Sequence, residues 1–311
     1  MARYLITGGA GFIGSNIARR LVKEGGEVVI LDDFSTGYES NLDDIMDEVN
    51  VISGDICDMD RVREATEGAD YVLHHAAVVS VVRSVEDPRR TSEVNIGGTL
   101  NCLVAAREAG VKRFVFAGSS SAYGDNPDLP KLEDMKAEPL SPYAVSKLAG
   151  EMYVNVFNDV YGLPGLTLRY FNIFGPYQDP TSQYAAVIPI FITHLARGEA
   201  PTIYGDGEQS RDFTYIDNAV EANLLALRAE GAPGKVFNVA CGSRFTLNHL
   251  FKRLQQLIKN TVEAEYAEPR PGDVRHSLGD ISRAREILRY EPLVSFDEGL
   301  KKTVDWFVPR A

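Results

Sequence analysis

The sequence predicts an α/β protein in which a doubly wound parallel sheet carries a smaller, interleaved α/β lobe. Short apolar runs alternate with helical periodicity through residues 1–171, and a glycine-rich turn follows the first of these runs. Alternating signals of this kind specify a parallel sheet with helices on both faces. The alternation breaks after residue 172, so we expect one domain over residues 1–171, to which residues 214–240 return. Residues 172–213 and 241–311 then form the smaller lobe.

A glycine-rich turn organises the first domain. Residues 7–14 read T-G-G-A-G-F-I-G and follow the apolar residues 4–6, with glycines at positions 8, 11 and 14. Because glycine has no Cβ, the backbone can turn sharply here and a pyrophosphate can approach the N–H groups at a helix N-terminus. Ile13, Ile17 and Leu21 then recur at helical spacing. This pattern predicts a phosphate-binding loop between a strand and a helix.

An acidic residue ends the next expected strand. Residues 28–31 are apolar, and Asp32 follows them directly. A carboxylate at this place suits the hydroxyls of an adenosine ribose and repels a 2′-phosphate. Strand, loop, helix, strand and acid in this order predict a Rossmann dinucleotide-binding domain that prefers NAD to NADP.

The remaining elements follow in order along the chain. Further strands are expected at residues 49–52, 71–73, 114–117, 166–168 and 236–239, and features of the main sheet return over residues 211–216. Helices are expected from residue 58, over 89–109, from residue 142, and over 186–197, 218–227, 247–258 and 296–306. Asn95 lies inside the long helix over 89–109, where a buried amide needs hydrogen-bond partners.

Composition limits the classes of function. The 311 residues carry 32 basic and 44 acidic side chains, a formal net charge of −12, which argues against nucleic-acid binding. No apolar run approaches the roughly 20 residues that span a bilayer, and the chain enters a core strand without room for a signal peptide. Cys57, Cys102 and Cys241 are scattered, without metal-ligand spacing. We therefore expect a cytoplasmic protein with free thiols, no metal and no membrane contact, whose anionic ligands need locally placed arginines.

Tyr143 and Lys147 form a candidate acid–base pair. They are four residues apart on one expected helix, so their side chains point the same way. A free tyrosine, with a pKa near ~10, is a poor base at neutral pH, but a neighbouring ammonium and an oxidised nicotinamide lower that pKa. The hydroxyl of Ser119, at the end of the strand over 114–117, can hydrogen-bond the same substrate oxygen. Behind a NAD-binding loop, this set predicts a catalytic site rather than an ordinary amphipathic helix.

At these residues the sequence resembles the extended short-chain dehydrogenase/reductase family and, within it, the UDP-hexose 4-epimerases. The resemblance extends from T-G-G-A-G-F-I-G to the closing L-K-K-T-V-D-W-F. It implies that Ser119 is catalytic, that Tyr143 is the base and that Lys147 holds the nicotinamide ribose. The cofactor contacts that it implies are Gly8, Gly11, Phe12, Ile13, Gly14, Asp32, Asp33, Ser35, Thr36, Gly37, Asp55, Ile56, Ala77, Val79, Asn95, Tyr143, Lys147 and Tyr170.

The resemblance also implies a UDP-sugar site in the smaller lobe. Arg211, in G-D-G-E-Q-S-R-D-F, and Arg270, in R-P-G-D, are expected to bind the diphosphate, since guanidiniums suit a pyrophosphate in an acidic protein. Asn172 adds an amide to a phosphate oxygen, Tyr204 flanks the uracil and Asp273 contacts the ribose. The full set of expected substrate contacts is Ser80, Ser119, Ser120, Ser121, Tyr143, Asn172, Ala186, Val187, Tyr204, Arg211, Arg270, Asp273 and Ser277.

The resemblance indicates which hexoses are accepted. Ser277 falls at the position that walls the pocket beside the sugar C2 substituent, where glucose-restricted members carry a tyrosine. Residues 183–189 read Q-Y-A-A-V-I-P, which is similar to members that accept N-acetylhexosamines. A serine leaves room for the N-acetyl group without rejecting the smaller sugar. We expect turnover of both plain and N-acetylated UDP-hexoses.

The implied reaction is inversion at C4 through a transient 4-keto sugar, with no net oxidation. A sugar-nucleotide 4,6-dehydratase needs an acid–base pair, usually Asp-Glu, after the catalytic hydroxyl, where this chain has Ser120 and Ser121. A UDP-glucuronate 4-epimerase stays open, because it differs mainly in what meets the C6 group. A regulator that binds NAD without turnover also stays open, although such modules generally lack the Ser, Tyr and Lys set.

The family pairs its long helix with its catalytic helix across a two-fold axis. For this chain the two are residues 89–109 and the helix from Tyr143 onward, and they would build a four-helix bundle in a homodimer. Leu148, Met152 and Phe157 fit a partly packed face of the second helix, although packing within one chain explains them too.

Overall fold

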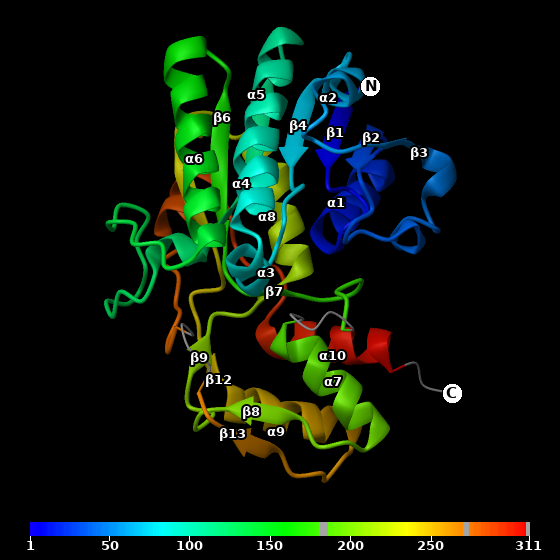
Figure 1. The fold of residues 1–311 in the computed structure, drawn as a ribbon. Coiled ribbons are helices and arrows are strands. Elements are labelled where there is room, and N and C mark those ends of the chain that lie inside the picture. The colour runs from blue at the N-terminus through cyan, green and yellow to red at the C-terminus, as the bar shows by residue number, and fades with distance from the viewer. Residues whose placement is uncertain (181–185, 270–273, 309–311) are drawn as a thin grey trace.

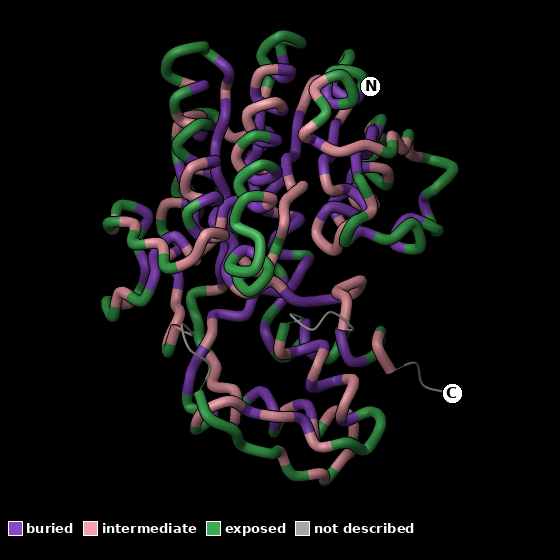
Figure 2. Tube along the Cα trace, in the orientation of Figure 1, coloured by how far each residue is buried: buried purple, intermediate pink, exposed green. Residues whose placement is uncertain are grey.

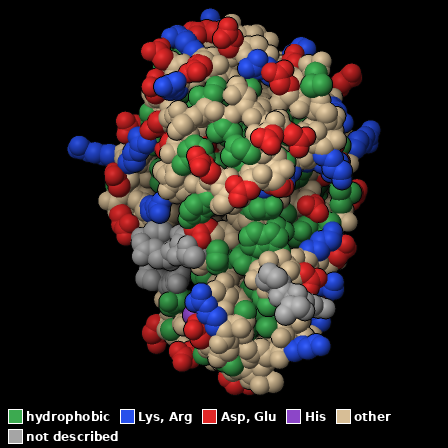
Figure 3. All heavy atoms as spheres, turned by 90° about the vertical axis from the view of Figure 1, so that its right-hand side faces the viewer, with side chains coloured by type: hydrophobic (Ala, Val, Ile, Leu, Met, Phe, Trp, Pro, Cys, Tyr) green, Lys and Arg blue, Asp and Glu red, His purple; other side chains and the backbone are tan. Residues whose placement is uncertain are grey.

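The computed structural model describes residues 1–180, 186–269 and 274–308. Figure 1 shows an upper body, built on a sheet, above a smaller lower body that contains helices and short strands. In Figure 2 the buried residues follow the strands of the upper body and the inward sides of its helices. Seen from the side of the N-terminal strands, hydrophobic side chains gather where the two bodies meet (Figure 3). One buried apolar core includes residues of both bodies, such as Ile6 and Leu250.

The upper body contains a seven-stranded sheet in the order β11-β6-β5-β4-β1-β2-β3. Every neighbouring pair in it is parallel. The strands are β1 (Arg3–Thr7), β2 (Glu27–Asp32), β3 (Val49–Ser53), β4 (Tyr71–His74), β5 (Arg113–Ser119), β6 (Gly165–Tyr170) and β11 (Val236–Val239). The expected strands lie within these limits, and the doubly wound α/β fold is confirmed. Because the strands are parallel, their carboxyl ends meet at one edge, where such folds bind ligands.

Helices cover both faces of the sheet and bury an apolar core on each. One core joins Ile6 and Ile30 to α1 (Phe12–Lys23) and α8 (Ile216–Arg228). The other joins Leu5 and Val29 to α2 (Met59–Thr66), α5 (Thr99–Glu108) and α6 (Pro142–Tyr161). Neighbouring residues of one strand point to opposite faces, so apolar side chains in succession fill both cores.

The long helix expected over residues 89–109 is helical along its length but is not one regular helix. It consists of α4 (Pro88–Ser92), the π-helical segment η3 (Glu93–Gly98) and α5, and the unexpected α3 (Val81–Glu86) precedes it. The Thr99 hydroxyl donates a 2.7 Å hydrogen bond to the Asn95 carbonyl within this segment. Such side-chain bonds to the preceding turn compete with the regular helical pattern.

The lower body is held by three short two-stranded ladders and by helices. The ladders pair β7 (Ile173–Phe174) with β10 (Thr214–Tyr215), β8 (Thr202–Tyr204) with β13 (Glu265–Ala267), and β9 (Ser210–Arg211) with β12 (Phe245–Thr246). Its helices are α7 (Val187–Arg197), α9 (Leu247–Ile258) and α10 (Phe296–Phe307). The π-helical η5 (Ala284–Leu288) packs instead against α8 and β11 of the upper body. Three 3₁₀ turns complete the described elements: η1 (Glu39–Asn41), η2 (Met46–Glu48) and η4 (Ser120–Tyr123).

One expectation about the sheet is wrong. Residues 211–216 do not return to the main sheet, because β9 and β10 pair with β12 and β7 outside it. The chain rejoins the upper body through α8 and through β11, which pairs with β6. The division into domains at the residues expected above stays a prediction. Within the described residues, no helix combines the length and apolar character that crossing a bilayer requires.

Candidate functional site

The glycine-rich loop forms a close-packed cradle between β1 and α1. Gly8 has φ of 70°, and a Cβ there would lie 2.6 Å from the Ala76 nitrogen. A Cβ on Gly14 would lie 2.2 Å from the Gly8 carbonyl oxygen. Gly11 precedes α1 in extended conformation, and no side chain caps the helix by a hydrogen bond. The N–H groups at Phe12 and Ile13 therefore begin a helix whose positive end is uncovered, as a pyrophosphate requires.

Asp32 lies at the end of β2 beside this loop and is buried. Its Oδ2 accepts a 2.9 Å hydrogen bond from the Ala10 nitrogen, and its Oδ1 accepts one of 2.9 Å from the Phe34 nitrogen. Burial raises the pKa of this carboxyl, while the two backbone bonds oppose that rise. The carboxylate is thus fixed in direction by the loop that it adjoins.

The next loop carries the other residues expected at the adenosine end. Asp33 accepts hydrogen bonds from the backbone and the hydroxyl of Ser35, while Thr36 is exposed. Gly37 packs so closely that a Cβ there would lie 2.9 Å from the Ala10 carbonyl carbon and 3.0 Å from Asp32 Oδ1. The loop therefore folds back onto the glycine cradle.

Further expected cofactor contacts, after β3 and after β4, are also held in place. Asp55 accepts a 2.5 Å bond from Arg90, and Ile56 is buried beside it. Asn95, which needed partners, has three: its Oδ1 accepts from the Val78 nitrogen at 2.7 Å, and its Nδ2 donates to the Val78 oxygen and to the Ser146 hydroxyl. Asn95 thereby ties the loop of Ala77, Val79 and Ser80 to the catalytic helix. Ser80 also caps α3.

Ser119, Tyr143 and Lys147 come together at the carboxyl edge of the sheet. Ser119 ends β5, and the other two lie one turn apart on α6, which Ser141 caps through the Ala144 nitrogen at 3.1 Å. Ser119 hydrogen-bonds Tyr143 and accepts from the Ser121 hydroxyl at 2.8 Å. Ser120 and Ser121 form the turn after the strand. The predicted catalytic residues thus form one contiguous group.

Burial dominates the electrostatics of this group. The Lys147 side chain is 4% exposed, and its Nζ donates a 3.0 Å hydrogen bond to the Ala117 carbonyl. Burial lowers the pKa of this ammonium to about 8. Burial raises the pKa of Tyr143, and the hydrogen bond with Ser119 opposes that rise. The pKa of Tyr143 is therefore raised in the protein alone, whereas the sequence predicts that Lys147 and an oxidised nicotinamide lower it.

Two histidines at the end of β4 belong to networks that the sequence did not suggest. His74 lies between the hydroxyls of Thr7 at 2.6 Å and Thr99 at 2.9 Å, and burial holds its pKa well below the usual value. His75 lies 2.9 Å from the hydroxyl of Tyr170, an expected cofactor contact, which also accepts from Asn223 at 2.8 Å. The sequence signal that could have indicated these networks is the pair of adjacent histidines at the end of an expected strand.

The expected substrate residues gather just beyond β6. Asn172 has φ of 38°, and its Nδ2 donates to the Asp212 carbonyl at 3.3 Å and to the Ser277 hydroxyl at 3.1 Å. Arg211 Nη1 donates to the carbonyls of Ser210 at 3.0 Å and Arg275 at 3.2 Å. One cluster therefore contains Asn172, Arg211 and Ser277. Asn172 lies two residues after Tyr170 in the chain.

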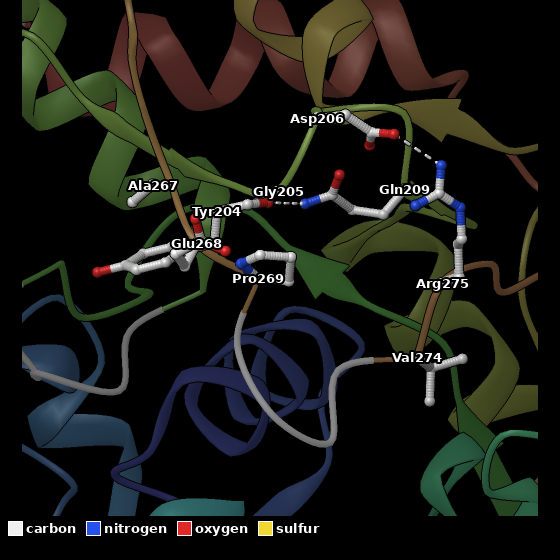
Figure 4. A pocket seen from close by; sticks show the side chains of 9 residues that line it. All are labelled: Tyr204, Gly205, Asp206, Gln209, Ala267, Glu268, Pro269, Val274 and Arg275. Carbon is white, nitrogen blue, oxygen red and sulfur yellow. Dashed lines mark hydrogen bonds and ion pairs between the residues drawn. The ribbon is translucent and has the colours of Figure 1, made fainter.

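A pocket of about 520 Å³ adjoins this cluster (Figure 4). Tyr204 lies beside Glu268 and Pro269 at one end, and Arg275 reaches Asp206 at 2.8 Å at the other. Gln209 donates a 2.5 Å bond to the Tyr204 carbonyl. An aromatic ring at the wall of an open pocket suits a planar base.

Of the remaining expected substrate residues, two lie at the start of a described helix and two lie outside the described residues. Ala186 and Val187 are at the N-terminus of α7, and Ala186 is exposed. Arg270 and Asp273 lie outside the described residues, as do residues 183–185 of the Q-Y-A-A-V-I-P stretch. Their assignments stay predictions.

Known proteins resemble this chain along its whole length. The family model for the NAD dependent epimerase/dehydratase family matches residues 4–240. A UDP-glucose 4-epimerase of Mycolicibacterium smegmatis is 40% identical over 98% of both chains. The structure of Thermotoga maritima UDP-glucose 4-epimerase with UDP-glucose is 40% identical, has a TM-score of 0.94 and covers 98% of both chains. The UDP-N-acetylglucosamine 4-epimerase of Methanobrevibacter ruminantium, with UDP-N-acetylmuramic acid, matches with the same identity and TM-score over 99% of this chain and 98% of its own. The chain belongs to the NAD-dependent epimerase/dehydratase family.

Proposed function

We propose that this chain is a UDP-hexose 4-epimerase that uses NAD as its cofactor. The observation that carries the proposal is the group of Ser119, Tyr143 and Lys147 at the carboxyl edge of the sheet. In the strand order, β4 separates β5, which ends at Ser119, from β1, which leads into the glycine cradle. The cradle suits a dinucleotide, because Gly8 and Gly14 let the loop pack tightly against the neighbouring backbone while the N-terminus of α1 stays uncapped. Asp32 adds a buried carboxylate that suits the ribose hydroxyls of NAD and disfavours the 2′-phosphate of NADP.

The Tyr143 phenolate is the group that takes the proton from the sugar 4-hydroxyl. Ser119 holds it by a hydrogen bond, and a second hydrogen bond from Ser121 fixes Ser119 in turn. Bound NAD⁺ would supply reversible hydride transfer at C4 and a positive charge that favours the phenolate. Lys147 keeps a buried ammonium close to this centre. General acid–base groups placed in this way typically contribute about 10²–10⁴-fold to rate.

The nucleotide is held away from the reacting carbon. We assign the diphosphate to Arg211 and Asn172, which share one cluster, and the base to the neighbouring pocket that Tyr204 lines. A substrate anchored there leaves the hexose free to turn about its phosphate bonds as a 4-keto sugar. When it presents its other face, return of hydrogen to C4 inverts the configuration.

The turn after β5 favours epimerisation over elimination of water. The side chains at positions 120 and 121 are serines, and the Ser121 hydroxyl is used by Ser119 at 2.8 Å. Loss of water across C5 and C6 needs a base at C5 and an acid at O6, which hydroxyls at ordinary pKa do not supply. A 4-keto sugar in this site is therefore expected to be reduced back to a hexose rather than to lose water.

Product analysis tests the proposal. Purified protein is incubated with UDP-glucose and, separately, with UDP-N-acetylglucosamine, and the sugar nucleotides are separated. We expect the corresponding galacto isomers from both, with no added oxidant. Tyr143→Phe is the control, expected to keep the fold and NAD while losing interconversion. Turnover of Tyr143→Phe at the wild-type rate would remove the tyrosine from its role.

We also propose that the protein is a homodimer through a four-helix bundle. A stripe of apolar residues on α6 is partly exposed: Val145, Met152, Val156 and Val160 are 48%, 58%, 47% and 68% accessible. Phe157 does not belong to this stripe, because it packs inside the chain. An apolar stripe of this kind commonly marks an interface. A cytoplasmic location is a further proposal, supported by three free cysteines.

A further inference from the structure

We propose that Asp212 is a positioning residue that holds the substrate cluster of Asn172, Arg211 and Ser277 in its binding geometry. The inference rests on the proposed function, because it concerns the residues assigned there to the diphosphate and the hexose. Asp212 itself is fully buried and lies between β9 and β10.

The carboxylate of Asp212 gathers main-chain N–H groups from two remote segments. Oδ1 accepts from the Cys241 nitrogen at 2.9 Å, and Oδ2 accepts from the nitrogens of Gly242 at 3.1 Å and Gly279 at 3.2 Å. No basic side chain of the described residues forms an ion pair with it. A buried acid without a cation is costly unless several donors satisfy both of its oxygens. The arrangement therefore uses the negative charge to bind three stretches of backbone together.

The backbone of Asp212 connects this set of hydrogen bonds to the substrate residues. Its carbonyl accepts the 3.3 Å hydrogen bond from Asn172, and its backbone nitrogen donates a 3.4 Å hydrogen bond to the Ser277 hydroxyl. Arg211 is the preceding residue and extends toward the Arg275 carbonyl. A shift of Asp212 thus moves all three substrate residues at once.

The geometry leaves little room for adjustment. A Cβ on Gly279 would lie 2.7 Å from the Ala240 Cβ, so the two segments held by Asp212 already touch. An asparagine has one acceptor oxygen where aspartate has two, and its NH₂ group would face a backbone N–H. Leaving one buried donor unsatisfied is enough to weaken a site by about tenfold or more.

The test compares Asp212→Asn with a matched control, Asp217→Asn, whose carboxylate is exposed on α8 and lies 3.9 Å from Lys302. Binding of UDP is measured by calorimetry, and kcat and KM are measured for UDP-glucose. For Asp212→Asn we expect the Kd of UDP and the KM to rise together by tenfold or more. NAD content should stay at the wild-type level and kcat should fall less than about threefold. The control should match the wild type.

A folded Asp212→Asn variant that binds UDP as the wild type does would overturn the inference. So would an equal loss of NAD and UDP, which indicates general structural damage. If the variant fails to fold, hydrogen exchange on the wild type decides. The amides of Cys241, Gly242 and Gly279 should be protected, and UDP should slow their exchange further; exchange that UDP does not change refutes the role.

The proposed function and this inference fail in different ways. A wild-type protein that binds UDP but interconverts no UDP-hexose contradicts the function and leaves the UDP comparison valid. An active wild type whose Asp212→Asn variant keeps its UDP affinity contradicts only the inference.

Discussion

Lys147→Met should make the NAD-free protein more stable while abolishing its activity. The Lys147 residue is 4% exposed, and its ammonium donates a hydrogen bond to the Ala117 carbonyl. Burial lowers its pKa from 10.5 to about 8, which corresponds to about 3 kcal/mol of destabilisation when the group is charged in the folded state. Losing the hydrogen bond costs about 1 kcal/mol. Methionine has a similar shape, so the net gain should be about 2 kcal/mol at pH 7.

The gain should depend on pH in a defined direction. Between pH 8 and pH 10.5 the unfolded chain keeps a proton that the folded chain has released, so wild-type stability rises relative to the variant across this window. Below pH 8 the full free-energy cost of burying the charged Lys147 ammonium is present. By pH 10 it falls to about 1 kcal/mol, and the advantage of Lys147→Met should vanish.

Urea unfolding of NAD-free protein at pH 7 and pH 10 measures the effect. Lys252→Met, at an exposed position on α9, is the matched control and should change stability by less than about 0.5 kcal/mol. The reasoning is refuted if Lys147→Met is less stable than the wild type at pH 7, or if its advantage is the same at both pH values.

Three further predictions concern the cofactor, the sugar and the assembly. Cofactor extracted from purified protein should be NAD(H), because the buried Asp32 carboxylate at the end of β2 suits ribose hydroxyls better than a 2′-phosphate; mainly NADP(H) would contradict this. Ser277→Tyr should abolish interconversion of UDP-N-acetylglucosamine and spare that of UDP-glucose, with a raised KM because the bond from Asn172 is lost; unchanged rates on the acetylated sugar would place the wall elsewhere. Val156→Arg should shift sedimentation at micromolar concentration from dimer to monomer, whereas Leu293→Arg, at an exposed site outside the stripe, should not; a monomeric wild type would refute the dimer.

The parts of the site that depend on local spacing could be predicted from sequence. The cradle of Gly8, Gly11 and Gly14 lies between one strand and one helix, so the motif that identifies it is contained in eight residues. Tyr143 and Lys147 share a face because α6 repeats every 3.6 residues. Strands β1, β2 and β11 are apolar runs bounded by turns, which local patterns identify well.

Other parts depend on contacts between remote residues and could not be predicted. Asp212 binds nitrogens at 241, 242 and 279, and nothing near it in sequence indicates that it is buried. Strands β9 and β10 are two residues each, too short for a periodic signal, and their partners decide that they leave the main sheet. The raised pKa of Tyr143 arises from burial by the folded protein, which spacing does not reveal.

The most direct test of the proposed 4-epimerase activity is the reaction of UDP-glucose with the purified protein in deuterium oxide, followed by NMR. We predict UDP-galactose as the product, with no deuterium at C4, since hydrogen leaves and returns there without exchange with water. We also predict no deuterium at C5 and an intact C6 hydroxyl, because Ser120 and Ser121 replace the groups that elimination needs. A 4-keto-6-deoxy product, deuterium at C4, or recovery of UDP-glucose alone would contradict it.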